Sequence, residues 1–319
     1  MKTRRAFLVE SKKFNIMEID VEPKPTDLLI EVSVCGLCNW ELNHWNGNIG
    51  NCPQSLGHEW AGKVVMVGEH TNGFDIGDKV TGISDTMTGF SEYTIVDYKK
   101  VIKLAPGTDD RLALGEPLKC VITVLKAAAP KVGDYGVIVG CGAMGLWCIQ
   151  ALRGSILSGL IAIDANDERL KLAGLYGATH TINPKTEPVD SYLYDITKGH
   201  MADFVIEGTG NPEVLGACVP YLKANARGRL VLMSSHEGPC RFFDFREAIA
   251  RSIEILVAHP GYSMDQMDDF RRAVNFLNAG TFDLSKIITH SFTLDEIQSA
   301  FETLEKKPSG YIKGVVYPH

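Results

Sequence analysis

This sequence of 319 residues has no long hydrophobic run and no cluster of basic residues. The apolar segment near the N-terminus is only a few residues long before Glu10, and no other stretch approaches the roughly 18 apolar residues of a membrane span. We therefore expect neither a signal peptide nor a membrane-spanning helix. The formal net charge is −7, which argues against nucleic acid and anionic membrane surfaces as partners.

Cysteine is too sparse for a disulfide-bonded scaffold. The eight cysteines are spread over the whole chain, and several lie inside apolar segments. Reduced thiols in a cytoplasmic protein are the best interpretation of this pattern. The sequence also has no internal repeat and no low-complexity segment. With 45% hydrophobic and 22% charged residues, the composition is that of a globular protein long enough for two domains.

The N-terminal part of the chain is predicted to form mostly β-strands. Segments rich in β-branched residues are separated by clusters of Pro, Gly, Asn and Asp, and no helical period lies between them. This pattern favours a compact antiparallel β domain. Its predicted strands are residues 5–9, 27–34, 62–68, 79–83 and 92–96.

After about residue 122 the pattern changes to strands that alternate with helical segments, which favours a doubly wound parallel sheet. Capping signals at Ser263 and Thr293 then begin two helices of a C-terminal tail, and a last strand follows. We expect this tail to return to the β domain. The predicted domains are therefore residues 1–122 with 260–319, and residues 123–259. The six strands predicted for the sheet are residues 136–140, 160–163, 179–183, 203–207, 228–233 and 253–257.

Gly140, Gly142 and Gly145 form a G-x-G-x-x-G motif between the first strand of this sheet and the helix after it. Such glycines allow a tight turn, a close approach of the backbone to a pyrophosphate and close packing of the helix. Asp164 ends the next strand, where a carboxylate would bind ribose hydroxyls and repel a 2′-phosphate. The sequence therefore predicts a dinucleotide site that favours NAD over NADP. This predicted site also includes Ala143, Met144 and Arg169.

Three places in the sequence outside the parallel sheet offer metal ligands. They contain Cys38 with Glu41, His58 with Glu59, and Glu116. Thiolate, imidazole and carboxylate are the ligands that Zn²⁺ selects, and a catalytic zinc needs about three of them with one open position. Each residue alone has a structural explanation, as a buried thiol, a loop histidine or the end of an element. Their presence beside a dinucleotide motif favours a metal site.

Together these motifs resemble those of the zinc-dependent medium-chain dehydrogenase/reductase family of alcohol and polyol dehydrogenases. The resemblance implies a discontinuous GroES-like β domain and a Rossmann domain. It also implies that Cys38 and His58 bind a catalytic zinc, that Glu59 binds it or lies just outside, and that Glu41 orients His58. In the polyol branch the glutamate matching Glu116 contacts the metal directly or through water. The matching segments are residues 34–41, 56–62, 77–80, 89–93, 116–118, 140–145 and 175–183.

The sequence departs from the family pattern near the predicted metal site. Only residues 81–88 stand where many members carry a lobe with four cysteines, so we expect one zinc per subunit and no structural zinc. Trp40 replaces the usual Ser or Thr, and Asn43 the usual His, of the proton relay. His44 is a candidate proton carrier, with an exposed loop histidine as the alternative. Cys120 competes with Glu116 as third ligand.

The resemblance places Thr123 near the nicotinamide, Thr209 along the cofactor and Lys313 near the pyrophosphate. The predicted function is a zinc- and NAD-dependent dehydrogenase of a secondary alcohol, with a polyol, cyclitol or sugar derivative as substrate, and a homodimer or homotetramer as its assembly. Two alternatives remain at this point. One is a zinc-free reductase of activated double bonds or quinones, and the other is a non-catalytic dinucleotide-binding protein.

Overall fold

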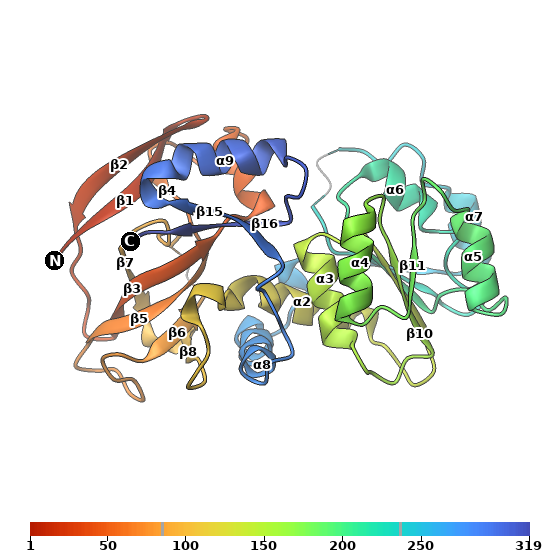
Figure 1. Ribbon diagram of the computed structural model, residues 1–319, viewed down its shortest axis with the longest axis horizontal. Coiled ribbons are helices and arrows are strands. Elements are labelled where there is room, and N and C mark those ends of the chain that lie inside the picture. The colour runs from red at the N-terminus through yellow and green to blue at the C-terminus, as the bar shows by residue number, and fades with distance from the viewer. Residues whose placement is uncertain (84–85, 236–237) are drawn as a thin grey trace. The chain divides into compact units, whose positions relative to one another are not determined.

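The structure is a computed structural model that describes residues 1–83, 86–235 and 238–319. The chain divides into two compact units (Figure 1). The first unit combines Met1–Lys119 with Phe270–His319, and the second is Cys120–Asp269. The units divide after residues 119 and 269, whereas the predicted domains divide after residues 122 and 259. Helix α2 (Gly115–Ala128) begins in the first unit and ends in the second.

Antiparallel strands make up most of the first unit, as the sequence predicts. A three-stranded sheet has the order β2-β1-β4, and a seven-stranded sheet has the order β15-β16-β3-β5-β6-β8 with β7 also paired to β3. The bounds of the small sheet are β1 Lys2–Glu10, β2 Lys13–Asp20 and β4 Gln54–Ser55. Those of the large sheet are β3 Asp27–Gly36, β5 Glu59–Val67, β6 Lys79–Gly82, β7 Tyr93–Asp97, β8 Val101–Lys103, β15 Ile288–Thr293 and β16 Lys313–Tyr317.

One strand pair in the first unit is parallel, which the sequence did not indicate. Strands β15 and β16 run in the same direction. Helix α9 (Ile297–Lys306) connects them and packs against both, because parallel neighbours need a crossover connection (Figure 1). Its buried face, which includes Phe301, joins a core formed by alternate residues of β3 such as Leu28, Ile30 and Val32.

The second unit contains the predicted parallel sheet. Its six strands have the order β11-β10-β9-β12-β13-β14 among the residues described. This order reverses direction between β9 and β12, which is the topology of a doubly wound fold. The strands are β9 Tyr135–Val139, β10 Gly159–Ile163, β11 His180–Ile182, β12 Phe204–Glu207, β13 Arg229–Leu232 and β14 Glu254–Val257. The helices are α3 Ala143–Leu152, α4 Asp167–Tyr176, α5 Val189–Ile196, α6 Pro212–Ala217 and α7 Phe245–Arg251.

Strand register in the first unit brings distant parts of the sequence together. In the pairing of β3 with β5, Gly36 lies opposite Glu59. In the pairing of β3 with β16, Gly36 lies opposite Val315. A Cβ at Gly36 would come within 2.1 Å of Glu59 Oε2, so the absence of a side chain there leaves room for the carboxylate. The end of β3 is therefore the point around which the metal-ligand candidates gather.

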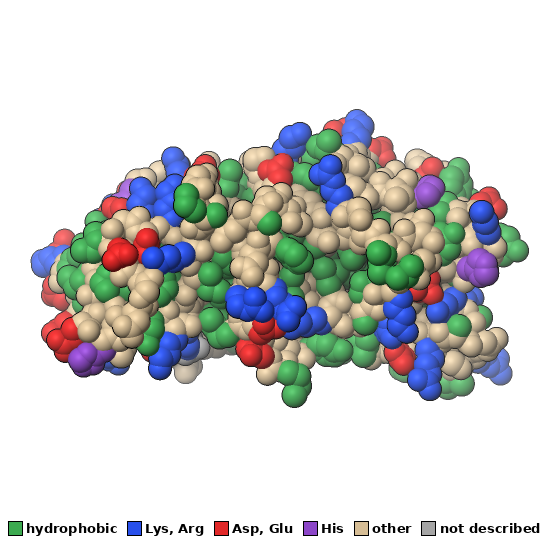
Figure 2. All heavy atoms as spheres, turned by 90° about the horizontal axis from the view of Figure 1, so that it is seen from below, with side chains coloured by type: hydrophobic (Ala, Val, Ile, Leu, Met, Phe, Trp, Pro, Cys, Tyr) green, Lys and Arg blue, Asp and Glu red, His purple; other side chains and the backbone are tan. Residues whose placement is uncertain are grey.

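No helix in the described parts of the chain is both long and apolar enough to span a bilayer. On the face drawn in Figure 2, basic and acidic side chains lie among one another. This mixture agrees with a net charge of only −7 in a chain of 319 residues.

Candidate functional site

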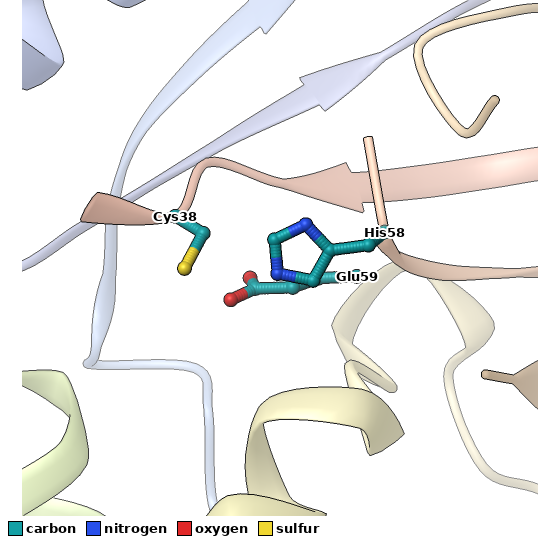
Figure 3. A group of neighbouring side chains, drawn as sticks. All are labelled: Cys38, His58 and Glu59. Carbon is teal, nitrogen blue, oxygen red and sulfur yellow. The ribbon is translucent and has the colours of Figure 1, made fainter. Parts of the chain in front are cut away.

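Cys38, His58 and Glu59 form a group of potential metal ligands in the first unit. One ligand atom from each residue lies within 4.8 Å of the other two, and the three side chains point toward one another (Figure 3). Cys38 follows β3, while His58 precedes β5 and Glu59 begins it. The pairing of these two strands therefore assembles a sulfur, a nitrogen and an oxygen donor, which is the donor set of a catalytic zinc.

Glu41 fixes the orientation of the His58 ring. This fully buried carboxylate lies at the end of a short 3₁₀ helix, Asn39–Glu41. Its Oε1 accepts a hydrogen bond from the backbone N–H of Gly57 at 2.8 Å and lies 3.0 Å from His58 Nδ1. Because a carboxylate only accepts, Nδ1 keeps a proton, and Nε2 is the nitrogen that can lose its proton and offer a lone pair to a metal.

The charges of this group suit a divalent cation. Partial burial and the nearby carboxylate of Glu59 raise the pKa of the Cys38 thiol. Burial disfavours the imidazolium of His58, but the Glu41 carboxylate and the Cys38 sulfur raise the pKa of His58 well above its usual value. Without a metal, these shifts favour the protonated forms of both groups. A bound dication would replace these protons, as at other thiolate and imidazole sites.

Two lysine side chains accompany the carboxylates near this group. The Nζ atom of Lys313 lies 2.5 Å from Oε2 of Glu59. Burial disfavours the Lys313 ammonium, but the charges of Glu59 and Cys38 raise its pKa above the usual value. Lys119 pairs with Glu116 at 2.8 Å, and the other oxygen of Glu116 lies 3.9 Å from His58 Nε2. Sequence reasoning missed Lys119 and assigned Lys313 only to the cofactor.

Two candidates for the third ligand lie outside the compact group. Neither Glu116 nor Cys120 belongs to the ligand atoms within 4.8 Å of one another among the described residues, whereas Glu59 does. Of the two, Glu116 comes close to the group through His58. The geometry therefore favours Glu59 as the third protein ligand, with Glu116 beside it.

The structure contradicts one of the two interpretations of His44. His44 lies in helix α1 (Leu42–Trp45) and is only 6% exposed, so it is not an exposed loop histidine. Its Nδ1 lies 2.9 Å from Oε1 of Gln54, and its Nε2 has no hydrogen-bond partner among the described residues. The Trp40 ring contacts the rings of both His44 and His58 edge-on, with centroids 4.9 and 5.8 Å away. His44 as a proton carrier stays a prediction.

In the second unit, the glycine motif forms the expected turn between β9 and α3. Gly140 has a φ of +95°, which favours glycine, and a Cβ at Gly145 would lie 2.0 Å from the carbonyl oxygen of Gly140. Gly142 is the N-cap of α3, and Ala143 and Met144 are its first residues. The free N–H groups at this helix start are suited to phosphate.

Asp164 lies beside this turn, at the end of β10. Its Oδ2 accepts a hydrogen bond from the N–H of Cys141 at 2.7 Å, and its Oδ1 accepts one from Asn166 at 2.9 Å. The guanidinium of Arg169 lies 4.0 Å from Oδ2. The carboxylate is therefore held at the phosphate-loop end of the sheet, where the sequence predicted it to meet a ribose.

The other predicted cofactor residues make internal contacts. The Thr209 side chain approaches Gly140, and its backbone N–H donates to the buried carboxylate of Glu207 at 2.7 Å. The Thr123 hydroxyl donates to buried Asp269 at 2.8 Å. Thr209 thus lies beside the phosphate loop, whereas Thr123 has a partner of its own. Their roles toward a cofactor stay predictions.

The sequence matches two family models. Residues 24–106 match the alcohol dehydrogenase GroES-like domain, and residues 143–279 match the zinc-binding dehydrogenase domain. An L-threonine 3-dehydrogenase of Pyrococcus abyssi is 30% identical over 98% of this chain and 96% of its own length. A sorbitol dehydrogenase of Halalkalibacterium halodurans is 25% identical over 90% of this chain and 92% of its own.

The fold also matches solved structures. One is a Sinorhizobium meliloti protein assigned as a zinc-binding dehydrogenase and bound to NADP, with a TM-score of 0.87 and 23% identity. The match covers the full length of both chains. The GroES-like and Rossmann architecture predicted from the sequence is confirmed by these comparisons. They also favour the zinc-dependent interpretation over the zinc-free reductase.

Proposed function

The chain belongs to the family of zinc-binding, NAD(P)-dependent alcohol and polyol dehydrogenases, and we propose that it oxidises a secondary alcohol of the polyol, cyclitol or sugar class with NAD. The group of Cys38, His58 and Glu59 is the observation on which this proposal depends. Relatives named for threonine and for sorbitol support a hydroxyl substrate with several polar groups.

The metal would be held by Cys38, His58 and Glu59, with Glu116 beside them. A bound zinc ion supplies Lewis acidity, which lowers the pKa of an alcohol and polarises a carbonyl. Glu41 holds the His58 ring in the tautomer that presents Nε2. The stretch of residues 81–88 contains no cysteine, which supports a single zinc per subunit and no structural zinc.

Trp40 and the lysines shape the surroundings of this metal group. Trp40 is 39% exposed and lies edge-on to His58, so its ring would form an apolar wall beside the substrate. Such a wall suits the C–H face of a polyol or sugar ring. Lys313 balances the charge of Glu59, a role that the sequence did not indicate.

NAD is the proposed cofactor because of Asp164. Its carboxylate is fixed beside the phosphate loop by two backbone N–H groups, where it would accept hydrogen bonds from a ribose and repel a 2′-phosphate. The NADP in the Sinorhizobium meliloti structure belongs to that protein, and Arg169 beside Asp164 is a group that can pair with a phosphate. The proposal therefore allows weaker use of NADP.

The proposed assembly is a homodimer or homotetramer formed through strand β14. This strand lies at one edge of the parallel sheet, so its outer backbone groups can pair with another strand. Val257 of β14 is 62% exposed, and Phe245 and Ile249 of α7 are 68% and 77% exposed. Exposed apolar side chains on this strand and on the helix that precedes it, with an edge that no strand of the described residues covers, support a second copy of this chain as the partner.

We place the protein in a reducing compartment such as the cytoplasm. None of the eight cysteines forms a disulfide in the described structure, and four of them are buried. Buried thiols outside disulfides are typical of proteins kept under reducing conditions.

A dehydrogenase screen tests the proposal directly. The purified protein is assayed with NAD and NADP against polyols, cyclitols, sugar alcohols and threonine, before and after treatment with a chelator, and its zinc content is measured. We expect NAD-dependent turnover of at least one secondary alcohol that chelation abolishes and zinc restores. Two results would overturn the proposal. One is folded protein that has no zinc at Cys38 and His58 although metal was supplied, and the other is the absence of turnover on the whole panel.

A further inference from the structure

One buried carboxylate belongs to the metal group and a second lies beside it, and each is paired with a buried lysine. Glu59 pairs with Lys313, and Glu116 pairs with Lys119. Lys119 is only 5% exposed. It lies three residues after Glu116 on α2, so the two side chains meet on the same face of the helix. An ammonium that is removed from water in this way is stable only with a charged partner.

The two oxygens of Glu116 face different neighbours. Oε1 lies 2.8 Å from Lys119 Nζ, and Oε2 lies 3.9 Å from His58 Nε2, the nitrogen available to a metal. Two ligands of a tetrahedral zinc lie about 3.3–3.8 Å apart, given bond lengths of about 2.0–2.3 Å. Glu116 is thus almost close enough to bind, but it remains outside the compact ligand group.

The ligand group already contains three protein donors, which is the number found at catalytic zinc sites. A fourth protein ligand would close the position that the substrate oxygen needs. Zinc sites with four protein ligands are structural rather than catalytic. Some feature of the structure must therefore keep the nearby carboxylate of Glu116 from binding as well.

We propose that Lys119 is a positioning residue that holds Glu116 beside the metal and so keeps one metal position open for the substrate. This inference rests on the proposed function, because it requires a metal at Cys38, His58 and Glu59. The ion pair fixes Oε1 and makes movement of Glu116 toward the metal costly, since it would leave the buried ammonium without this carboxylate. Glu116 remains free to accept a hydrogen bond from a substrate hydroxyl.

A double-mutant cycle with cobalt as a spectroscopic probe tests this role. Zinc is replaced by Co²⁺ in the wild type, Lys119→Met, Glu116→Gln and the double variant. In Lys119→Met we expect Glu116 to bind the metal, which changes the visible Co²⁺ spectrum, raises zinc affinity about tenfold and weakens binding of added imidazole. In the double variant the wild-type spectrum and affinity should return, because the carboxylate has gone.

Controls separate this role from a structural one. Lys13→Met removes an exposed ion pair of the same sequence spacing, with Glu10, and should leave the spectrum, zinc affinity and imidazole binding unchanged. Thermal unfolding shows whether each variant is folded. If the Met variant does not fold, Lys119→Gln, which keeps a polar end, takes its place in the cycle.

Two results would overturn the proposal. One is a folded Lys119 variant with the wild-type Co²⁺ spectrum and zinc affinity. The other is a spectral change that persists in the double variant, because Lys119 would then act through another group. Failure of the proposed function has a different signature, since the wild-type protein itself would bind neither Co²⁺ nor zinc.

Discussion

One candidate site is built from backbone groups, and the other is built from side chains. In the second unit, the phosphate loop is a backbone structure of a few consecutive residues, Gly140 to Gly145. In the first unit, the metal group consists of side chains from separate segments, and strand pairing and buried ion pairs hold them together. A backbone site should be disrupted by an added side chain that overlaps with it, whereas a side-chain site should be disrupted by the loss of a ligand atom or a charge.

This difference predicts that the two sites can be disabled separately. Each unit has its own hydrophobic core, and each site lies within one unit. Loss of the metal should therefore leave the nucleotide site intact, and damage to the glycine turn should leave the metal group intact. Four predictions test this separation, beginning with the largest expected effect.

Removal of a metal ligand should have the largest effect on catalysis. In Cys38→Ala we expect zinc to be lost and turnover to fall by roughly a thousandfold, because Lewis-acid stabilisation is worth several kcal/mol. Zinc content, turnover and NADH binding by fluorescence are measured together. Cys52→Ala, at an exposed cysteine outside the group, is the control. Weakened NADH binding in Cys38→Ala would show that the two sites are not separate.

A pair of glycine variants tests the backbone site. A Cβ at Gly145 would lie 2.0 Å from the Gly140 carbonyl oxygen, whereas a Cβ at Gly142 meets nothing within 4 Å. Gly145→Ala should thus lower the free energy of unfolding by about 1–3 kcal/mol. Gly142→Ala should leave stability unchanged and still weaken NADH binding, because the backbone must approach the pyrophosphate closely. Denaturant unfolding and NADH titration measure both effects.

Equal stability of the two glycine variants would contradict the steric argument. Unchanged NADH affinity in Gly142→Ala would contradict the assignment of this turn to a pyrophosphate. Zinc content should remain at the wild-type value in both variants, which is the result that separates this site from the metal group.

The same difference explains how much could be predicted from the sequence. The glycine turn and the acid after the next strand are local patterns, so the sequence predicted Gly140, Gly142, Gly145 and Asp164 together with the strands around them. The metal group spans distant segments. Ligand chemistry selected Cys38, His58 and Glu59 as candidates, and a family resemblance then assigned them to one zinc ion. Their assembly depends on the register of β3 with β5 and β16, which local patterns do not encode.

Other features of the first unit could not be predicted for the same reason. The parallel pairing of β15 with β16 depends on where α9 packs. The contact of His44 with Gln54 depends on the position of β4, which lies outside the helix that carries His44. The spacing of Glu116 and Lys119 could have indicated an ion pair on one face of the helix. That this pair lies beside the metal group follows only from the approach of Glu116 to His58. Contacts between distant segments decide the chemistry of this unit.

Glu41→Gln tests the side-chain site by removing a charge while nearly keeping the shape of the residue. The amide has nearly the same size, and its oxygen can still accept from His58 Nδ1 and the Gly57 N–H, but it lacks the negative charge that makes the His58 ring a stronger metal ligand. We expect zinc affinity to fall about 10- to 100-fold, the usual effect of removing a partner of a metal-bound histidine. Competition with a chelating dye measures the affinity. Glu18→Gln, at an exposed ion pair with Lys2, should bind zinc normally.

An unchanged zinc affinity in folded Glu41→Gln would mean that the metal group does not depend on the buried negative charge beside His58. That result would contradict the view that buried side-chain contacts hold this site together.

Asp164→Asn should have the smallest effect, and it tests a side chain in a site that is built mainly from backbone groups. The amide removes the negative charge that opposes a 2′-phosphate, while Arg169 remains beside it. We expect the ratio of kcat/KM for NAD over NADP to fall about tenfold, with stability nearly unchanged. Asp167→Asn removes a charge three residues later, at the start of α4, and should keep the wild-type ratio. A ratio that stays constant in Asp164→Asn would show that backbone geometry alone selects the nucleotide. The second unit would then hold a site in which this side chain has no role, in full contrast to the metal group.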